Sequence, residues 1–196
     1  MRLGIRFTVG IVVAVAGLFV ACSERRSVME VDGPAPPVSR SAEIAPPPFS
    51  AAQIREATRV GRTYRFRIEG PDAPTGYRRM RFTSVTDEGC TMEVTSLDLN
   101  DSPLGEPRVA QYSWDELVQH AAWPKAATEI TDVDIETPLG KKACWLYTVR
   151  ETRDGSDVVT RAWFAKDLPG APVRLEVKQD GEPVSKMLLV EHIHGE

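Results

Sequence analysis

The chain has 196 residues, of which 42% are hydrophobic and 27% are charged, and its formal net charge is −4. This composition excludes collagen-like, coiled-coil and wholly disordered chains, and the negative charge argues against a general nucleic-acid-binding protein. Three cysteines are too few for a fold built on disulfides. The length allows one globular domain of ordinary size, or at most two small ones.

The first 21 residues have the pattern of an export signal. Arg2 and Arg6 form a short basic region, and residues 7–21 follow without a charge. A helix of that length spans about 22 Å. The hydrocarbon core of a bilayer is about 30 Å thick, so the run is short for a permanent span. Residues 1–21 are therefore predicted to be a signal peptide.

The signal ends in the run Phe19-Val20-Ala21-Cys22. This run resembles the bacterial lipobox, the processing site of lipoprotein precursors, although Phe19 stands where leucine is usual. The resemblance implies that the Cys22 thiol is acylated, that the signal is removed, and that the protein is held to a membrane of the bacterial cell envelope. In a diderm, Ser23 after the cysteine implies the outer membrane. The alternative is an ordinary secretory signal followed by an incidental cysteine.

A proline-rich segment follows, and it is predicted to be a disordered tether over residues 22–49. Six prolines fall between residues 34 and 48. Proline removes backbone donors and disfavours helix in the residue before it. Few apolar side chains offset the cost of ordering. A spacer is the expected role, and a docking ligand is the alternative. One β-rich domain is then predicted over residues 50–196.

Local patterns divide this domain into strands and two helices. Ser50 with Gln53, and Ser113 with Glu116, match capping boxes that begin short helices. Alternating apolar residues and Asp-Gly turns indicate strands joined by hairpins. The helices are expected over 50–58 and 113–123, and the strands over 62–69, 77–85, 90–97, 128–136, 142–150, 157–165, 172–179 and 184–193.

Consecutive strands with short turns predict a fold that is mainly β with minor α. The expected form is a curved antiparallel sheet or a partly open β-barrel of about eight strands, with one or two short helices. Residues 137–147 and 162–170 are similar to turn-and-strand elements of the lipoprotein-localisation carriers and their lipid-transport relatives in bacterial envelopes. That resemblance implies an incomplete antiparallel barrel whose opening is filled by helices. It carries over no ligand-binding residue.

The second helix has an apolar stripe made of Trp114, Leu117, Val118 and Ala121. This spacing places the four side chains on one face. The stripe could face a hydrophobic ligand or lipid held between sheet and helix. The plainer interpretation is packing against the sheet.

Charges are segregated along the domain. Residues 52–86 carry eight basic and three acidic side chains, whereas residues 87–137 carry two basic and twelve acidic ones. Alternation predicts that the first two strands place their arginines on one outer face, where they would attract phosphate head groups or an acidic protein. A simply solvated face is the alternative. The arginines concerned are Arg65, Arg67, Arg79 and Arg81.

Two further groups invite chemical interpretations. Cys90 and Cys144 could form a disulfide in an exported protein, or they could be two buried thiols too far apart to bond. His192 and His194 are weak metal-ligand candidates for zinc or copper, which would need a third ligand such as His120. A solvated C-terminal tail is the expected alternative, and no cofactor is predicted.

No catalytic motif is recognisable, so no enzyme activity is predicted. Two functions stay open at this point. The protein could be a tethered binding module for a hydrophobic ligand, or an envelope interaction protein that has no small-molecule ligand. An apolar cavity beneath the second helix would favour the first.

Overall fold

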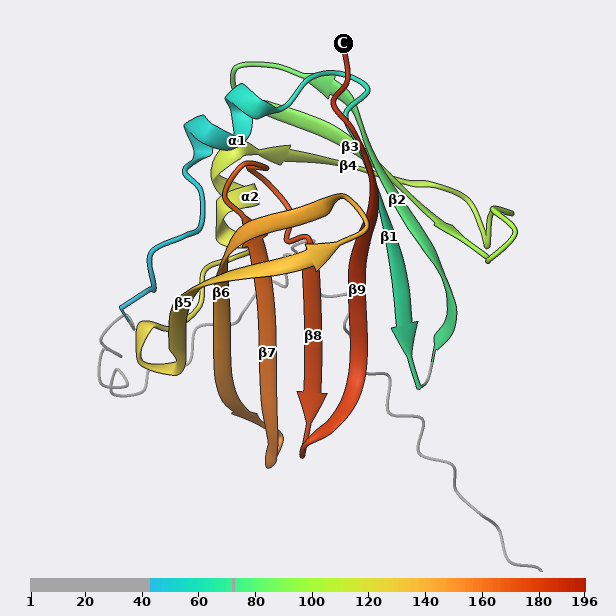
Figure 1. The fold of residues 1–196 in the computed structure, drawn as a ribbon. Coiled ribbons are helices and arrows are strands. Elements are labelled where there is room, and N and C mark those ends of the chain that lie inside the picture. The colour runs from blue at the N-terminus through green and yellow to red at the C-terminus, as the bar shows by residue number, and fades with distance from the viewer. Residues whose placement is uncertain (1–42, 72) are drawn as a thin grey trace, which may run out of the picture. The chain divides into compact units, whose positions relative to one another are not determined.

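Nine antiparallel strands form one sheet in the part of the chain that the computed structural model describes, residues 43–71 and 73–196 (Figure 1). The strand order is β4-β3-β2-β1-β9-β8-β7-β6-β5. The strands are β1 (Thr63–Gly70), β2 (Ala73–Val85), β3 (Gly89–Leu97), β4 (Arg108–Ser113), β5 (Thr128–Thr137), β6 (Gly140–Arg153), β7 (Ser156–Ala165), β8 (Arg174–Gln179) and β9 (Glu182–Ile193).

The fold class predicted from the sequence is confirmed: the described chain is mainly β with minor α, and the sheet is open. The sheet bends so that β5 approaches β9 without pairing with it (Figure 1). Edge strands β4 and β5 do not pair with each other. Strand β4 is additional to the eight strands expected. Its residues are exposed or half-buried throughout, so it lacks the alternation of a strand with one buried face.

The two helices begin where the capping boxes predict. Helix α1 (Ala51–Ala57) and helix α2 (Trp114–Gln119) each have a serine N-cap, with both reciprocal bonds of the box present. The prediction that the second helix continues to residue 123 is wrong. After Gln119 the backbone turns through i→i−3 bonds at Ala121 and Ala122, and a short 3₁₀ helix η2 (Lys125–Ala127) leads into β5.

Asp-Gly pairs make the tight turns of two hairpins. Asp154 and Gly155, between β6 and β7, have φ angles of 52° and 83°. Asp180 and Gly181, between β8 and β9, have φ angles of 50° and 87°. Two successive residues with positive φ match the twist of the flanking strands, which is why this dipeptide favours hairpins.

One face of the sheet, here called the inner face, carries the core. Residues paired across neighbouring strands point to the same face, so register assigns each side chain. Tyr64 pairs with Met80, Phe66 pairs with Leu189, and Tyr147 pairs with Ala162. All six of these side chains are 3% exposed or less. Both helices lie at one end of the sheet, and the hairpins of β6–β7 and β8–β9 extend away from them (Figure 1).

Residues 43–49 belong to this domain, which corrects the part of the predicted tether that the structure describes. Phe49 is 3% exposed, and its ring centroid lies 5.6 Å from that of Trp145 and 6.3 Å from that of Phe164. The Tyr147 hydroxyl donates a hydrogen bond of 2.8 Å to the carbonyl of Pro46. Composition indicated an extended segment, but it could not show that Phe49 had an aromatic site to fill. The predicted signal, Cys22 and the tether before residue 43 lie outside the described residues.

A buried arginine fastens the C-terminal strand to the start of β1. Arg62 is 2% exposed. Its guanidinium donates to His192 Nε2 at 3.1 Å, to Thr58 Oγ1 at 3.2 Å and to the Pro169 carbonyl at 2.9 Å. These neutral acceptors satisfy the buried cation without a carboxylate. Burial lowers the pKa of His192 to about 4, and the positive charge of Arg62 adds to the effect.

No helix among the described residues is long and apolar enough to cross a membrane.

Phe49→Ala is expected to destabilise the domain by about 3–5 kcal/mol, because it empties a filled aromatic site. Urea denaturation of the purified protein measures the change. Ile44→Ala is the matched control, since Ile44 is 50% exposed, and its effect should stay within about 0.5 kcal/mol. A change of less than about 0.5 kcal/mol for Phe49→Ala would mean that the Phe49 ring does not contribute to the stability of the fold.

Stability should fall as the pH is lowered from about 6.5 to about 4. In that window the unfolded chain takes up a proton at His192, whereas the folded chain, with its lowered pKa, does not. Below about pH 4 this contribution stays constant. His192→Gln keeps an acceptor for Arg62 and removes the titration, so its unfolding free energy should vary less with pH. His194→Gln should keep most of the dependence. The same slope in His192→Gln as in the unmodified protein would contradict this assignment.

Candidate functional site

The four residues of the apolar helix stripe do not share one environment. Trp114 and Ala121 are 5% and 8% exposed, whereas Leu117 and Val118 are half-buried. The indole nitrogen of Trp114 donates to the carbonyls of Thr86 at 3.2 Å and Asp87 at 3.0 Å, in the turn between β2 and β3. Trp114 is therefore an anchor of the helix. Only Leu117 and Val118 retain accessible apolar surface on this stripe.

The connection from β4 to β5 crosses the inner face. It starts at Trp114 beside the β2–β3 turn and brings Trp123 onto β6 and β7. The ring centroid of Trp123 lies 5.5 Å from that of Tyr147 and 6.2 Å from that of Phe164. The Ala45 amide donates to the Trp123 carbonyl at 2.9 Å. Two segments without strands, 43–58 and 114–127, therefore cover one end of the inner face together.

Sequence patterns missed this aromatic cluster. Phe49 fell in the predicted tether, and Trp123 marked only the end of a helix. Their common partner Phe164 lies on β7, and its ring also contacts Tyr147 on the paired strand β6. The contacts join positions far apart in the chain, so no local sequence pattern predicts them. The aromatic type of the residues was the one usable sign, since buried aromatic rings commonly pack edge to face.

Away from this cover, the apolar inner face becomes partly accessible. Along β1 the exposure rises from Phe66, which is fully buried, to the half-buried Ile68. Along β3 it rises from Met92, at 2%, to the half-buried Val94. A similar change separates Leu175 from Val177 on β8. The side chains Ile68, Val94 and Val177, here called the partly covered inner strip, offer an apolar ligand contact area that the core does not use.

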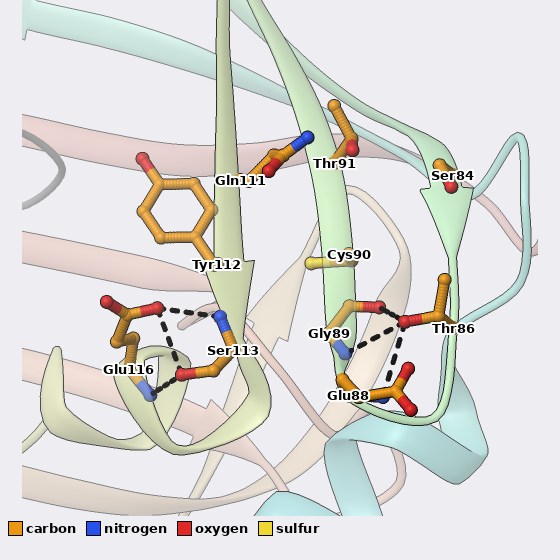
Figure 2. Close-up of a pocket in the computed structure, with 10 residues that line it drawn as sticks. All are labelled: Ser84, Thr86, Glu88, Gly89, Cys90, Thr91, Gln111, Tyr112, Ser113 and Glu116. Atoms are coloured by element: carbon orange, nitrogen blue, oxygen red, sulfur yellow. Dashed lines mark hydrogen bonds between the residues drawn. The ribbon is translucent and has the colours of Figure 1, made fainter.

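A pocket of about 360 Å³ lies between β3, β4 and the start of α2 (Figure 2). It is lined by Ser84, Thr86, Glu88, Gly89, Cys90, Thr91, Gln111, Tyr112, Ser113 and Glu116. No residue of the helix stripe is among them. This pocket is therefore not the apolar cavity that would hold a ligand beneath the helix.

Several polar side chains that line this pocket form hydrogen bonds with nearby backbone groups. The Glu116 carboxylate accepts hydrogen bonds from the Ser113 amide at 2.7 Å and from the Ser113 hydroxyl at 2.9 Å (Figure 2). These bonds lower the pKa of Glu116. The Thr86 hydroxyl oxygen accepts from the amides of Glu88 and Gly89, both at 3.2 Å (Figure 2). The first pair caps α2 and the second closes the β2–β3 turn, so both serve the fold.

The disulfide left open by the sequence does not form, because Cys90 and Cys144 are free, buried thiols. Cys90 lies on β3 and Cys144 on β6, with β2, β1, β9, β8 and β7 between them in the sheet. Burial raises the pKa of each thiol to about 11. Both are therefore protonated near neutral pH and are poor nucleophiles.

The four outer-face arginines share one side of β1 and β2, as alternation predicts. Arg65 pairs directly with Arg79, and Thr63 pairs with Arg81. Arg65 forms ion pairs with Asp101 and, at 3.9 Å, with Glu191. Arg65 thus meets a carboxylate from the acidic block 87–137 within the protein itself.

Arg67 is compensated as well, since its Nε lies 2.8 Å from a Glu69 carboxylate oxygen. Arg79 and Arg81 are exposed, and no ion pair in the described part of the chain includes them. The predicted basic patch therefore reduces to these two side chains.

His192 and His194 lie with their ring centroids 4.4 Å apart. His192 is not part of a solvated tail, because its Nε2 accepts the hydrogen bond from Arg62 and so has no lone pair there for a metal. Within residues 43–71 and 73–196, no three His, Cys, Asp or Glu side chains group as metal ligands.

No family model matches the chain, and no curated protein matches it by sequence. Three solved structures are similar in outline. The first is a protein from Bacteroides fragilis NCTC 9343 described as exported and YmcC-like in fold, at 14% identity and a TM-score of 0.46, covering 69% of this chain and 97% of that one. The second is the complex of MucA and MucB from Pseudomonas aeruginosa, at 12% identity and a TM-score of 0.48, covering 72% of this chain and 54% of that one. The third is MucB, at 11% identity and a TM-score of 0.48, covering 74% of this chain and 57% of that one. At these values, function has to be argued from the chain's own residues.

Proposed function

We propose that the protein is a lipid-anchored protein of the bacterial envelope that binds a hydrophobic ligand on the inner face of its sheet. It acts as a binding module and not as an enzyme. The observation that carries the proposal is the partly covered inner strip. Ile68, Val94 and Val177 continue the apolar core surface beyond the segments that cover it.

Helix α2 adds two apolar side chains to the proposed site. Leu117 and Val118 on α2 are half-buried, in contrast to the buried Trp114 that anchors the helix. A ligand that replaces water on these side chains gains about 25 cal/mol for each Å² of apolar surface removed from water. The strip and the two helix side chains together would bind an acyl chain without displacing the aromatic cluster.

Anchoring is proposed from the N-terminal sequence. The uncharged run of residues 7–21 ends at Cys22, where the lipobox-like segment offers a thiol for acylation. Several acyl chains bind a membrane almost irreversibly, since each buried methylene contributes about 0.8 kcal/mol. In a diderm, the outer membrane is the proposed location.

An interaction surface for another envelope protein is the second candidate. It rests on three exposed apolar side chains, Leu99, Leu104 and Val109, which are 57%, 57% and 64% exposed. Val109 lies on edge strand β4 and shares the outer face with Arg81, because both pair with Glu93. Such a group suits an acidic partner with apolar residues.

Cys22→Ser should abolish acylation, because serine supplies no thiol for the lipid. Incorporation of labelled palmitate into the protein, followed by membrane fractionation, measures both label and location. The unmodified chain is expected to carry label and to sediment with membranes, and the variant to carry none. Labelling that persists in the variant would contradict lipidation at Cys22. In a diderm host, separation of the two membranes tests the outer-membrane location.

Leu117→Gln combined with Val118→Gln should weaken binding of the neutral fluorescent probe N-phenylnaphthylamine about tenfold, because two apolar contacts are lost. Probe fluorescence titrated with purified protein measures the affinity. Val109→Gln on the outer face is the control and should leave it unchanged. Thermal melts confirm that each variant is folded. If the unmodified protein does not bind the probe, the ligand proposal is wrong and the exposed apolar residues Leu99, Leu104 and Val109 become the better candidate.

A further inference from the structure

Two arginines lie on the inner face among the apolar side chains. In the register, Arg78 on β2 pairs with Phe66 on one side and with Ser96 on the other. Arg108 on β4 pairs with Val94, which in turn pairs with Met80. Phe66 and Met80 are core residues, so Arg78 and Arg108 point to the core side of the sheet. Strand β3 lies between the two arginines and presents Val94 and Ser96 to the space they share.

Among residues 43–71 and 73–196, these two positive charges have no carboxylate partner. The outer-face Arg65 differs, since it has Asp101 and Glu191 as partners. Arg78 is half-buried, and its pKa is lowered by burial and by the positive charge of Arg108.

Arg78 is the more desolvated of the two, since Arg108 is exposed, and an anion bound between them would relieve their repulsion. A guanidinium remains protonated in proteins, so it cannot relieve the repulsion by losing its proton. A partly desolvated cation beside a second cation is costly without a paired anion. Guanidinium groups bind carboxylate and phosphate oxygens through charge-assisted hydrogen bonds, often in pairs. The exposed Ser96 offers a hydroxyl beside Arg78 as a further donor.

The surroundings of the pair are apolar. Phe66 is fully buried, and Ile68 and Val94 are half-buried members of the partly covered inner strip. A small inorganic anion would satisfy the charges but would leave this strip in contact with water. An anion joined to an alkyl chain satisfies both.

We propose that Arg78 and Arg108 bind the anionic head group of an amphiphile whose alkyl chain lies on the inner face along Ile68 and Val94. The head group is a carboxylate or a phosphate. This inference rests on the proposed function and adds to it the chemical class of the ligand. It also assigns the two arginines as the residues that select an anionic ligand over a neutral one.

The test compares three ligands that share one ten-carbon chain and differ in the head group: decanoate, decyl phosphate and decanol. Each displaces N-phenylnaphthylamine from the full-length protein, and the loss of fluorescence gives its affinity. Decanoate or decyl phosphate should bind at least about tenfold more tightly than decanol. The difference should shrink as salt screens the charges. Tighter binding of the phosphate indicates a phospholipid-like ligand, and tighter binding of the carboxylate indicates a fatty acid.

The double variant Arg78→Gln with Arg108→Gln should bind all three ligands alike, with the affinity for decanol unchanged. Arg79→Gln with Arg81→Gln removes two charges from the outer face and should keep the discrimination. Thermal melts verify folding of both variants. The inference is overturned if the double variant still binds the anionic ligands more tightly than decanol, or if the unmodified protein does not. In either case, binding of decanol would still support the proposed function.

Two other outcomes are informative. If none of the three ligands displaces the probe and the probe itself does not bind, the proposed function fails and this inference fails with it. If a hexaglutamate peptide displaces N-phenylnaphthylamine as effectively as decyl phosphate does, the ligand is an acidic peptide and the amphiphile is overturned.

Discussion

An open sheet with one apolar face is stable in water only when that face is covered, and here the cover is provided by two segments that contain no strand. Phe49 and Trp123 supply aromatic rings that pack on Phe164 of the sheet. Hydrogen bonds from Ala45 to Trp123 and from Tyr147 to Pro46 join the two segments to each other and to β6. The capped helices α1 and α2 complete this layer. The architecture depends on these contacts, because neither edge strand pairs with the other to close the sheet.

The cover ends before the apolar face does, and this difference creates the candidate site. Under the cover, inner-face residues such as Phe66 and Met92 are buried and serve stability. Beyond it, Ile68 and Val94 are half-buried, and charges replace apolar side chains at the neighbouring positions. A single β-sheet surface thus changes from core to binding surface along its strands. The polar pocket near α2 differs in kind, since its Glu116 and Thr86 already hold the helix cap and the turn.

Local signals predicted much of the fold. Eight strands, both capping boxes and the Asp-Gly hairpins depend on residues close in sequence, and the structure has them. Strand β4 was missed because it is an edge with no buried face. Phe49 was assigned to the tether because its partners come more than ninety positions later in the chain. The charge pattern suggested a basic patch, but only the folded chain shows that Arg65 meets Asp101, and only the sheet register shows that Arg78 lies on the core side. Whether Cys90 and Cys144 can bond also depends on the order of the strands in the sheet. Their separation in the sequence does not show that order.

The position of residues 43–49 at the N-terminal edge of the described domain has a consequence under mechanical force. The first described residues, 43–49, belong to the cover and not to any strand of the sheet. Tension applied from the N-terminal side of Glu43 therefore loads the bridge between Ile44 and Pro124 and the contact of Pro46 with Tyr147 before it loads any strand ladder. A few hydrogen bonds broken one after another resist far less force than a ladder sheared along its length. Pulling on the N-terminal side would detach residues 43–49 from the inner face before any strand of the sheet separates.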